Sequence, residues 1–274
     1  MYGEADQLSA PIAENALSTE DGPMSSQTKE TEVFMPFPGP QHEVIFLRRP
    51  QRFLADIHFS DGKREVAYCA NSGSMTGFLR PGSGALIWDS ADPKRARRYT
   101  LRAVAFEGVW VGTDTHLSNR IVEEALRLKL VPGLEAYDVV ARERRIGEGL
   151  RVDFALTANA AECLVEVKSA TIVENGVARF PDSKTPRGVK QLEALKAQAL
   201  TGKRVVLLFL VQRDDAHSFV VSSTFDPAYA RAFDQATEAG VEVLALSVAV
   251  SQEGFSSPKL LPYGQSRLAA VETS

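Results

Sequence analysis

The pattern of apolar and polar positions changes near residue 113 of this chain. Between residues 43 and 112 apolar residues alternate with polar ones in short runs such as EVIFL, REVAYCA and YTLRAVAF, with turn residues between them. This alternation is typical of β-strands, and no helical period interrupts it. Five or six such strands predict a small all-β N-terminal barrel, and an OB-like barrel matches the size.

The second half of the chain favours an α/β fold. Apolar residues recur at helical spacing from Ile121 to Leu128, with Ser118 or Asn119 as candidate N-cap. The strand-like runs DVVARERRI, RVDFALT, CLVEVKS, RVVLLFLVQ and GVEVLALSVAV then alternate with helical patterns in RGVKQLEALKAQAL and over 226–238. Strands that are apolar on both faces must be covered on both, so we expect a mixed sheet flanked by helices.

These patterns divide the chain into four parts. Residues 1–40 are acidic and polar and end in MPFPGP, which predicts a disordered extension. Residues 41–113 form the predicted OB-like nucleic-acid-binding domain, and residues 114–251 form the predicted α/β domain. Residues 252–274 lack a clear period, and we expect a C-terminal tail.

Composition limits the class of protein. The chain of 274 residues is 44% hydrophobic, without an apolar run near the roughly 18 residues of a membrane-spanning helix. No secretory signal pattern stands at the N-terminus, so a cytoplasmic protein is expected. Cys69 and Cys163 lie in separate apolar runs and are expected to be core thiols, and the four histidines show no zinc-ligand spacing.

The charge is unevenly distributed. The net charge is -4, but residues 1–40 hold seven acidic residues against one basic residue. Residues 41–112 carry eleven basic and seven acidic residues, which favours a polyanion as the partner of the barrel. The candidate nucleic-acid-binding residues are Arg48, Arg49 and Arg52, then Lys94, Arg95, Arg97 and Arg98, and, opening the helix after Thr185, Arg187 and Lys190.

Two further stretches of the predicted barrel each allow two interpretations. Phe53 could stack a base from a barrel strand, but FLADI alternates, so its place in the core is the favoured interpretation. The glycine-rich stretch NSGSMTGFLRPGSG, which begins at Asn71, lacks the P-loop pattern. Its polar residues could contact a DNA backbone, or the stretch could fold over the barrel.

Charged residues interrupt two apolar strands of the α/β part. Glu166 and Lys168 share one strand face, while Val165 and Val167 share the other. If RVDFALT and CLVEVKS pair as a hairpin, Asp153 lies beside Glu166 and Lys168. Adjacent carboxylates repel each other unless a cation lies between them, and Mg²⁺ or Mn²⁺ with Asp153 and Glu166 as ligands suits this place. The alternative is an ion pair of Glu166 with Lys168 on a solvated face.

The order of these residues resembles the PD-(D/E)XK nuclease superfamily. Asp153 is followed after twelve residues by Glu166-Val167-Lys168, although Val152 stands where the superfamily usually has proline. The resemblance implies that Asp153 and Glu166 bind the metal, that Lys168 assists the attacking water, and that a glutamate of the preceding helix supports the site. We assign that last role to Glu124, because it lies nearer the apolar stripe of its helix than Glu123.

Longer stretches of the sequence resemble one particular family. They include RRPQRFLADI, NSGSMTGFLRPG, NRIVEEAL, RVDFAL, VENGVARFPDSKTPRGVKQLEAL and VVLLFLVQRDD, in this order. Together they resemble the SfsA (sugar fermentation stimulation protein A) family, which implies an OB-like domain, a nuclease-like domain and DNA binding. The chain departs from the family in its acidic extension and in Gln191, where a histidine is expected after Lys190. Gln191 can still hydrogen-bond a phosphate.

Two hypotheses for function follow from the residues and from the resemblance. The first is metal-dependent hydrolysis of DNA phosphodiesters at Asp153, Glu166 and Lys168, with Glu124 in support. The second is a non-catalytic DNA-binding regulator of sugar-utilisation genes, in which the nuclease site is vestigial. An enzyme acting on RNA or on a small phosphoester is a third reading. Nuclease cores of this kind often act as homodimers, but the sequence shows no interface.

Overall fold

The computed structural model describes residues 32–75, 77–147 and 149–264. The predictions for residues 1–31 and 265–274 lie outside these described residues. None of the helices in the described part of the chain is both long enough and apolar enough to cross a membrane.

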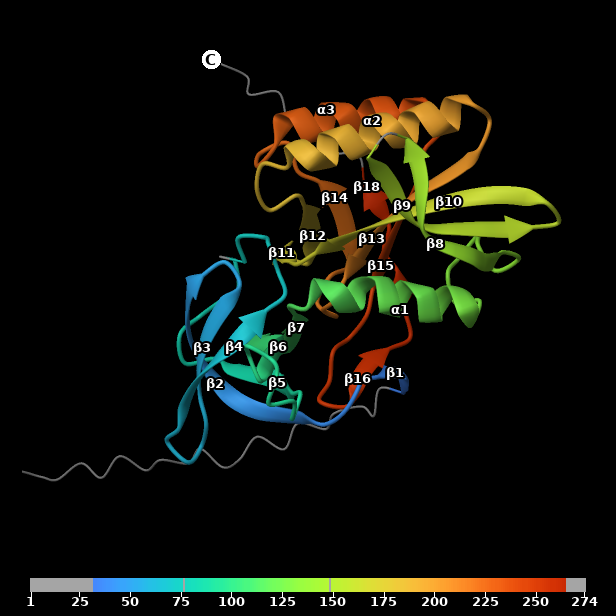
Figure 1. Ribbon diagram of the computed structural model, residues 1–274. Helices are drawn as coiled ribbons and strands as arrows, with labels where there is room; N and C mark the ends of the chain where they lie inside the picture. The colour runs from blue at the N-terminus through green and yellow to red at the C-terminus, as the bar shows by residue number, and fades with distance from the viewer. Residues whose placement is uncertain (1–31, 76, 148, 265–274) are drawn as a thin grey trace, which may run out of the picture. The chain divides into compact units, whose positions relative to one another are not determined.

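The N-terminal part of the described chain is a barrel (Figure 1). Its strands lie in the order β4-β3-β2-β5-β6-β7, and β4 also pairs with β6, which closes five strands. They are β2 (Gln41–Gln51), β3 (Leu54–His58), β4 (Arg64–Cys69), β5 (Gly84–Asp89), β6 (Tyr99–Phe106) and β7 (Val109–Gly112). Alternate residues such as Phe46, Ala55, Ile57 and Ala67 fill the interior, so the predicted OB-like barrel is confirmed.

The second part is built on a six-stranded mixed sheet in the order β17-β15-β13-β10-β9-β8. Strands β8, β9 and β10 are antiparallel neighbours, whereas β10, β13 and β15 run parallel. The strands are β8 (Asp138–Gly147), β9 (Leu150–Ala158), β10 (Ala161–Ala170), β13 (Arg204–Val211), β15 (Glu242–Ser247) and β17 (Lys259–Leu260). The central strand β13 is buried almost throughout, as expected for a strand covered on both faces.

Helices cover both faces of this sheet (Figure 1). Helix α1 (Thr115–Arg127) packs on the face that carries Cys163 and Val165. Helices α2 (Pro186–Leu200) and α3 (Pro227–Glu238) pack on the face that carries Leu164. The predicted α/β class is therefore confirmed.

Helix α1 begins earlier than the sequence predicted. Its N-cap is Asp114, whose carboxylate accepts a hydrogen bond from the backbone N–H of His116. Ser118 lies inside the helix and is buried, and its hydroxyl accepts a hydrogen bond from Gln212. The prediction of Ser118 or Asn119 as N-cap was wrong, because the first helical turn carries too little apolar pattern to mark its start.

A second, four-stranded sheet lies in the order β11-β12-β14-β18. Its strands are β11 (Ile172–Glu174), β12 (Val177–Phe180), β14 (Ser218–Val221) and β18 (Tyr263–Gly264). Strands β11 and β12 form a hairpin, and the chain after β12 leads through residues 181–185 into α2. This connection places the start of α2 close to the charged part of β10.

Two predicted boundaries were wrong. Strand β1 (Val33–Pro36) pairs with β16 (Gly254–Ser256), so the extension predicted over 1–40 ends in structured chain. The tail predicted from residue 252 likewise contains β16, β17 and β18. These strands have two to four residues, which is too short to show a period, and their partners are distant in sequence.

Candidate functional site

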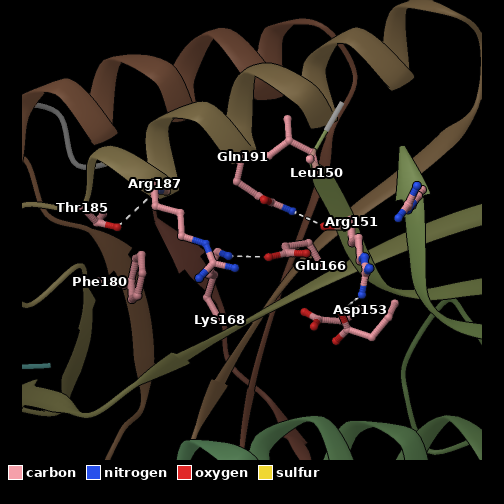
Figure 2. Close-up of a pocket in the computed structure, with 13 residues that line it drawn as sticks. Leu150, Arg151, Asp153, Glu166, Lys168, Phe180, Thr185, Arg187 and Gln191 are labelled. Carbon is pink, nitrogen blue, oxygen red and sulfur yellow. Dashed lines mark hydrogen bonds and ion pairs between the residues drawn. The ribbon is translucent and has the colours of Figure 1, made fainter. Parts of the chain in front are cut away.

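The predicted hairpin of β9 and β10 exists and brings the charged residues together. Phe154 pairs with Val165, and this register sets Asp153 beside Glu166. Lys168 lies two residues further along β10, on the same strand face as Glu166. The three side chains converge at one place on the sheet (Figure 2).

Each of the three side chains has an internal partner. The Asp153 carboxylate accepts a hydrogen bond from the Asn119 side-chain amide at 2.7 Å and another from the Val167 backbone N–H at 2.7 Å. The Lys168 ammonium forms an ion pair with one oxygen of Glu166. We name Asp153, Glu166 and Lys168 the carboxylate–lysine cluster.

Glu166 is the least solvated member of the cluster. It is 7% exposed, and burial together with the nearby Asp153 charge raises its pKa to about 7. The Lys168 ammonium and a hydrogen bond from Gln191 offset part of this effect. Burial and the second carboxylate therefore disfavour the ionised form of Glu166, and Lys168 compensates only in part.

Two cavities open onto the cluster, and Asp153, Glu166 and Lys168 line both. The helix-side cavity, about 630 Å³, is bounded by the start of α2 and by the β8–β9 hairpin. The barrel-side cavity, about 470 Å³, is bounded by Arg52, by residues 71–73 of the barrel and by the N-terminal part of α1. The cluster is thus accessible from two directions, unlike a charge buried for structure alone.

The start of α2 adds positive charge to the helix-side cavity. Thr185 caps the helix, and Arg187 extends from its first turn toward Lys168 and Glu166 (Figure 2). Arg145 and Arg151 of the β8–β9 hairpin also line this cavity. Cationic side chains around an open cavity favour a phosphate or another anion.

Of the two candidate residues Gln191 and Lys190, only Gln191 lines a cavity at the cluster. Gln191 lines the helix-side cavity but is 5% exposed, and its amide donates to the Arg151 backbone carbonyl at 2.6 Å. It therefore fixes α2 against β9. Lys190 does not occur among the described residues that line either cavity, so the structure does not bring it to the cluster.

The structure does not bring Glu124 to the carboxylate–lysine cluster. The Glu124 carboxylate forms an ion pair with Arg127 at 2.5 Å, and Glu124 is absent from the described lining of both cavities. The residue of α1 that reaches Asp153 is Asn119. Glu124 follows Asn119 by five positions and lies about 140° around the helix from it. Closeness to the apolar stripe did not identify the side of α1 that faces Asp153.

The basic residues of the barrel divide between two places. Arg48 lines a groove of about 960 Å³ together with Arg95, Arg97 and Arg98. Some of this charge is already paired, because Arg48 binds Asp56 and Arg98 binds Asp89. Lys94 is not among the described residues of this groove.

Arg49 has a structural environment rather than that of a phosphate ligand. Its guanidinium donates five hydrogen bonds, at 2.5–3.0 Å, to the backbone carbonyls of Arg52, Asn71, Gly73 and Ser74. These bonds hold residues 71–74, and Ser74 in turn donates its backbone N–H to Asp182 at 2.9 Å. Only Arg52 of the RRPQR segment lines the barrel-side cavity.

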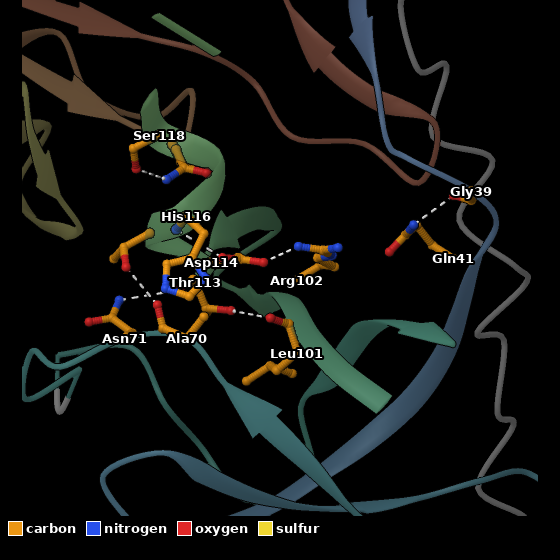
Figure 3. Close-up of polar contacts among 12 residues, drawn as sticks. Gly39, Gln41, Ala70, Asn71, Leu101, Arg102, Thr113, Asp114, His116 and Ser118 are labelled. Atoms are coloured by element: carbon orange, nitrogen blue, oxygen red, sulfur yellow. Dashed lines mark hydrogen bonds and ion pairs between the residues drawn. The ribbon is translucent and has the colours of Figure 1, made fainter. Parts of the chain in front are cut away.

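A second buried ion pair lies where the barrel meets α1 (Figure 3). Arg102 of β6 pairs with Asp114, and the two residues are 7% and 2% exposed. The Arg102 guanidinium also lies over the Trp88 ring, 5.1 Å from its centroid. Burial lowers the pKa of Arg102, although Asp114 opposes this effect.

The carboxylate–lysine cluster fits a hard divalent cation. Among the described residues, no group of three or more His, Cys, Asp or Glu side chains could hold a metal ion. Mg²⁺, however, is commonly held by one or two carboxylates, with waters and substrate phosphate as the other ligands. Asp153 and Glu166, which lie side by side on neighbouring strands, are such a pair of carboxylates.

Fold and site together define a class: a two-part protein in which an OB barrel precedes an α/β domain that carries paired carboxylates and a lysine. The family models for the SfsA N-terminal OB domain and the sugar fermentation stimulation protein RE domain match residues 47–113 and 116–254. The chain therefore belongs to the sugar fermentation stimulation protein (SfsA) family.

Relatives of known sequence and structure agree with this assignment. A sugar fermentation stimulation protein homolog from Ruegeria pomeroyi is 42% identical over 218 residues, covering 78% of this chain and 95% of the relative. A homolog from Geobacter sulfurreducens is 41% identical, covering 83% and 98%. The structure of Pyrococcus furiosus SfsA in complex with Ca²⁺ superposes with a TM-score of 0.77 at 29% identity, covering 85% of this chain and 99% of that chain.

Sequence reasoning missed three residues that the structure brings to the cavities. Asn119 was considered only as a helix cap, whereas its side chain orients Asp153. Arg145 and Arg151 were read only as parts of strands, yet they line the helix-side cavity. The hairpin register could have found Arg151, because it lies two positions before Asp153 on the same strand face.

Proposed function

We propose that this protein is a DNA-binding protein that hydrolyses DNA phosphodiester bonds at the carboxylate–lysine cluster, with a divalent cation. The observation that carries the proposal is the convergence of Asp153, Glu166 and Lys168 between two open cavities. Charged groups in a sheet cost free energy when they are left without compensation, and a purely structural cluster has no need of two solvent routes.

Asp153 and Glu166 would hold the cation, Mg²⁺ or Mn²⁺. Asn119 and the Val167 N–H fix the orientation of the Asp153 carboxylate for this task. When bound, such a cation stabilises negative charge on phosphate oxygens and lowers the pKa of a bound water. The Ca²⁺ complex of the Pyrococcus furiosus relative supports the choice of a cation with oxygen ligands.

The remaining groups would act on the substrate and on water. The Lys168 ammonium presents donors at the floor of both cavities, where it would orient the attacking water. Arg187 and Arg151 would hold the phosphate charge on the helix side. In this arrangement Gln191 keeps α2 at the correct distance from β9 through its bond to Arg151.

A cleavage assay tests this proposal. Labelled single-stranded, duplex and branched DNA would each be incubated with wild-type protein and Mg²⁺, Mn²⁺ or EDTA. The variants are Asp153→Ala and Lys168→Ala, and Glu124→Ala is the matched control because Glu124 lies outside both cavity linings. The proposal expects metal-dependent cleavage that Glu124→Ala retains and the other two variants lose.

DNA binding without cleavage under every condition would overturn the proposal. In that case the non-catalytic regulator becomes the better reading, and it makes its own prediction: Asp153→Ala would leave DNA affinity unchanged or improved, and Mg²⁺ would have no effect on it. Cleavage of RNA but not of DNA would also contradict the proposal.

A further inference from the structure

We infer that this protein takes single-stranded DNA, and that a row of aromatic rings on the barrel stacks its unpaired bases beside the barrel-side cavity. The row consists of Phe53, Tyr68 and His116, and we name it the aromatic row. This inference deepens the proposed function, since the stacked strand leads to the carboxylate–lysine cluster, and it rests on that proposal for the chemistry.

The rings form a continuous series. Phe53 stacks on Tyr68, with 6.4 Å between ring centroids and 28° between planes, and Tyr68 lies 6.4 Å from the His116 ring. Phe53 is 44% exposed, so the favoured reading of Phe53 as a core residue was wrong. It lies in the turn between β2 and β3, where the alternation of the neighbouring strands no longer decides which way a side chain points.

Hydrogen bonds and strand pairing fix the backbone around the three residues of the aromatic row. The Phe53 carbonyl accepts a hydrogen bond from the Cys69 N–H at 2.9 Å, and Tyr68 is paired with Leu54 in the barrel. His116 lies at the start of α1, where the Thr115 hydroxyl donates to the Ala70 carbonyl at 2.6 Å (Figure 3). Because this backbone is already ordered, binding a base requires little further ordering of the chain.

Residues next to the rings in the chain line the barrel-side cavity. Arg52 directly precedes Phe53 and lines that cavity, and so does Thr115, which directly precedes His116. Asn71 and Ser72, three and four residues after Tyr68, line it as well. Asp153, Glu166 and Lys168 lie in the same lining, so the cavity runs from the chain neighbours of the rings to the cluster.

The exposed rings, the charge of Arg52 and the size of the barrel-side cavity favour a single strand over a duplex. Every base has a π-face on which an aromatic ring can stack, but in a duplex both faces are covered by neighbouring base pairs. The exposed Arg52 supplies positive charge for the backbone beside the rings. The barrel-side cavity of about 470 Å³ falls in the range of roughly 300–1,000 Å³ that holds a single small ligand. It therefore suits one nucleotide of a strand rather than an intact duplex.

Binding measured in EDTA tests the inference without cleavage. Fluorescence anisotropy would compare a labelled oligothymidylate, an abasic strand of equal length, a duplex and an oligouridylate. Phe53→Ala is expected to weaken oligothymidylate binding by about tenfold, since the variant loses the stacking of one base on this ring. Phe53→Trp should retain the affinity because it keeps a π-face. Ile45→Ala, which truncates another exposed apolar side chain of the barrel, is the matched control and should bind like wild type.

The abasic strand separates stacking from other effects. It should bind wild type and Phe53→Ala equally, because it offers no base to stack. Equal affinity of wild type and Phe53→Ala for oligothymidylate would overturn the inference, and so would an equal loss on duplex and single strand. Preference for oligouridylate would overturn the assignment of DNA.

The failure of this inference can be told apart from that of the proposed function. If Phe53 matters for single-strand binding but no strand is cut with Mg²⁺ or Mn²⁺, the aromatic row stands and the nuclease proposal fails. If metal-dependent cleavage occurs only on duplex and Phe53→Ala cuts normally, the nuclease proposal stands and the aromatic row fails.

Discussion

Two clusters of buried charge in this protein differ in what surrounds them. Arg102 and Asp114 form a closed pair, 7% and 2% exposed, in which Asp114 also caps α1. The carboxylate–lysine cluster has two carboxylates for one lysine and opens onto two cavities. The comparison teaches that burial alone does not identify a functional charge. The imbalance of charge and the access to solvent are what distinguish the proposed cation site from the closed pair.

The largest expected effect is on cleavage. Lys168→Ala should lower the rate of metal-dependent DNA cleavage by about 10²–10⁴-fold, the range for losing a group that positions or transfers a proton. Its free energy of unfolding should change by only about 1 kcal/mol, because the Glu166 carboxyl, whose pKa is raised to about 7, can bind a proton when its partner is lost, whereas the Arg102 guanidinium stays charged. Single-turnover cleavage and urea unfolding of the same preparation measure both. If Lys168→Ala loses activity only because the protein unfolds, the cluster does not differ from the closed pair in its contribution to stability, and the account is contradicted.

The closed pair should show the reverse behaviour. Asp114→Ala leaves Arg102 buried without its partner and removes the helix cap, so we expect a loss of about 3–5 kcal/mol in unfolding free energy. The double variant Arg102→Met with Asp114→Asn keeps a capping side chain and removes both charges, and it should recover most of that loss. Chemical denaturation checks this. Equal destabilisation by both variants would contradict the account of the pair.

Arg49 and Arg52 of the barrel should differ in the same way, one acting on stability and the other on DNA binding. Arg49→Ala should cost about 2 kcal/mol, since its charged hydrogen bonds hold residues 71–74 in place. Arg52→Ala should leave stability unchanged and weaken binding of single-stranded DNA, with a smaller dependence of affinity on salt. Thermal unfolding and anisotropy across a salt series separate the two roles. Interchangeable effects of the two arginines would be inconsistent with the structure.

The smallest effect concerns Asp226, a carboxylate buried for structure. Burial raises its pKa, but backbone N–H donors of Thr185, Ala228 and Tyr229 outweigh burial and hold the pKa below 3.8. Its charged form therefore stabilises the fold above pH 3.8, and this contribution is lost as pH falls through the lowered pKa.

Asp226→Asn should thus cost about 1 kcal/mol near neutral pH and progressively less in acid, since asparagine also caps helices but carries no charge. Unfolding by urea at several pH values measures the difference from wild type. Asp234→Asn, on the exposed side of α3, controls for the loss of one negative charge. A cost that grows toward low pH would have the wrong sign.

Local periodicity was sufficient for much of the architecture. The alternating runs predicted the barrel. The β9–β10 hairpin was predicted from two successive apolar runs, and its register sets Asp153 beside Glu166. The pairing of β1 with β16 could not be predicted, because it joins short strands more than 200 residues apart. Asn119, rather than Glu124, reaches Asp153 because the rotation of α1 is set by packing against the sheet, which the helical period alone does not specify.

Titration of Mn²⁺ into the protein by calorimetry tests the central claim most directly. We predict that wild type and Glu124→Ala bind the ion at one site and that Asp153→Ala does not, because its loss leaves a single carboxylate beside Lys168. Binding that is unchanged in Asp153→Ala, or absent from wild type, would contradict the account of the carboxylate–lysine cluster as a cation site.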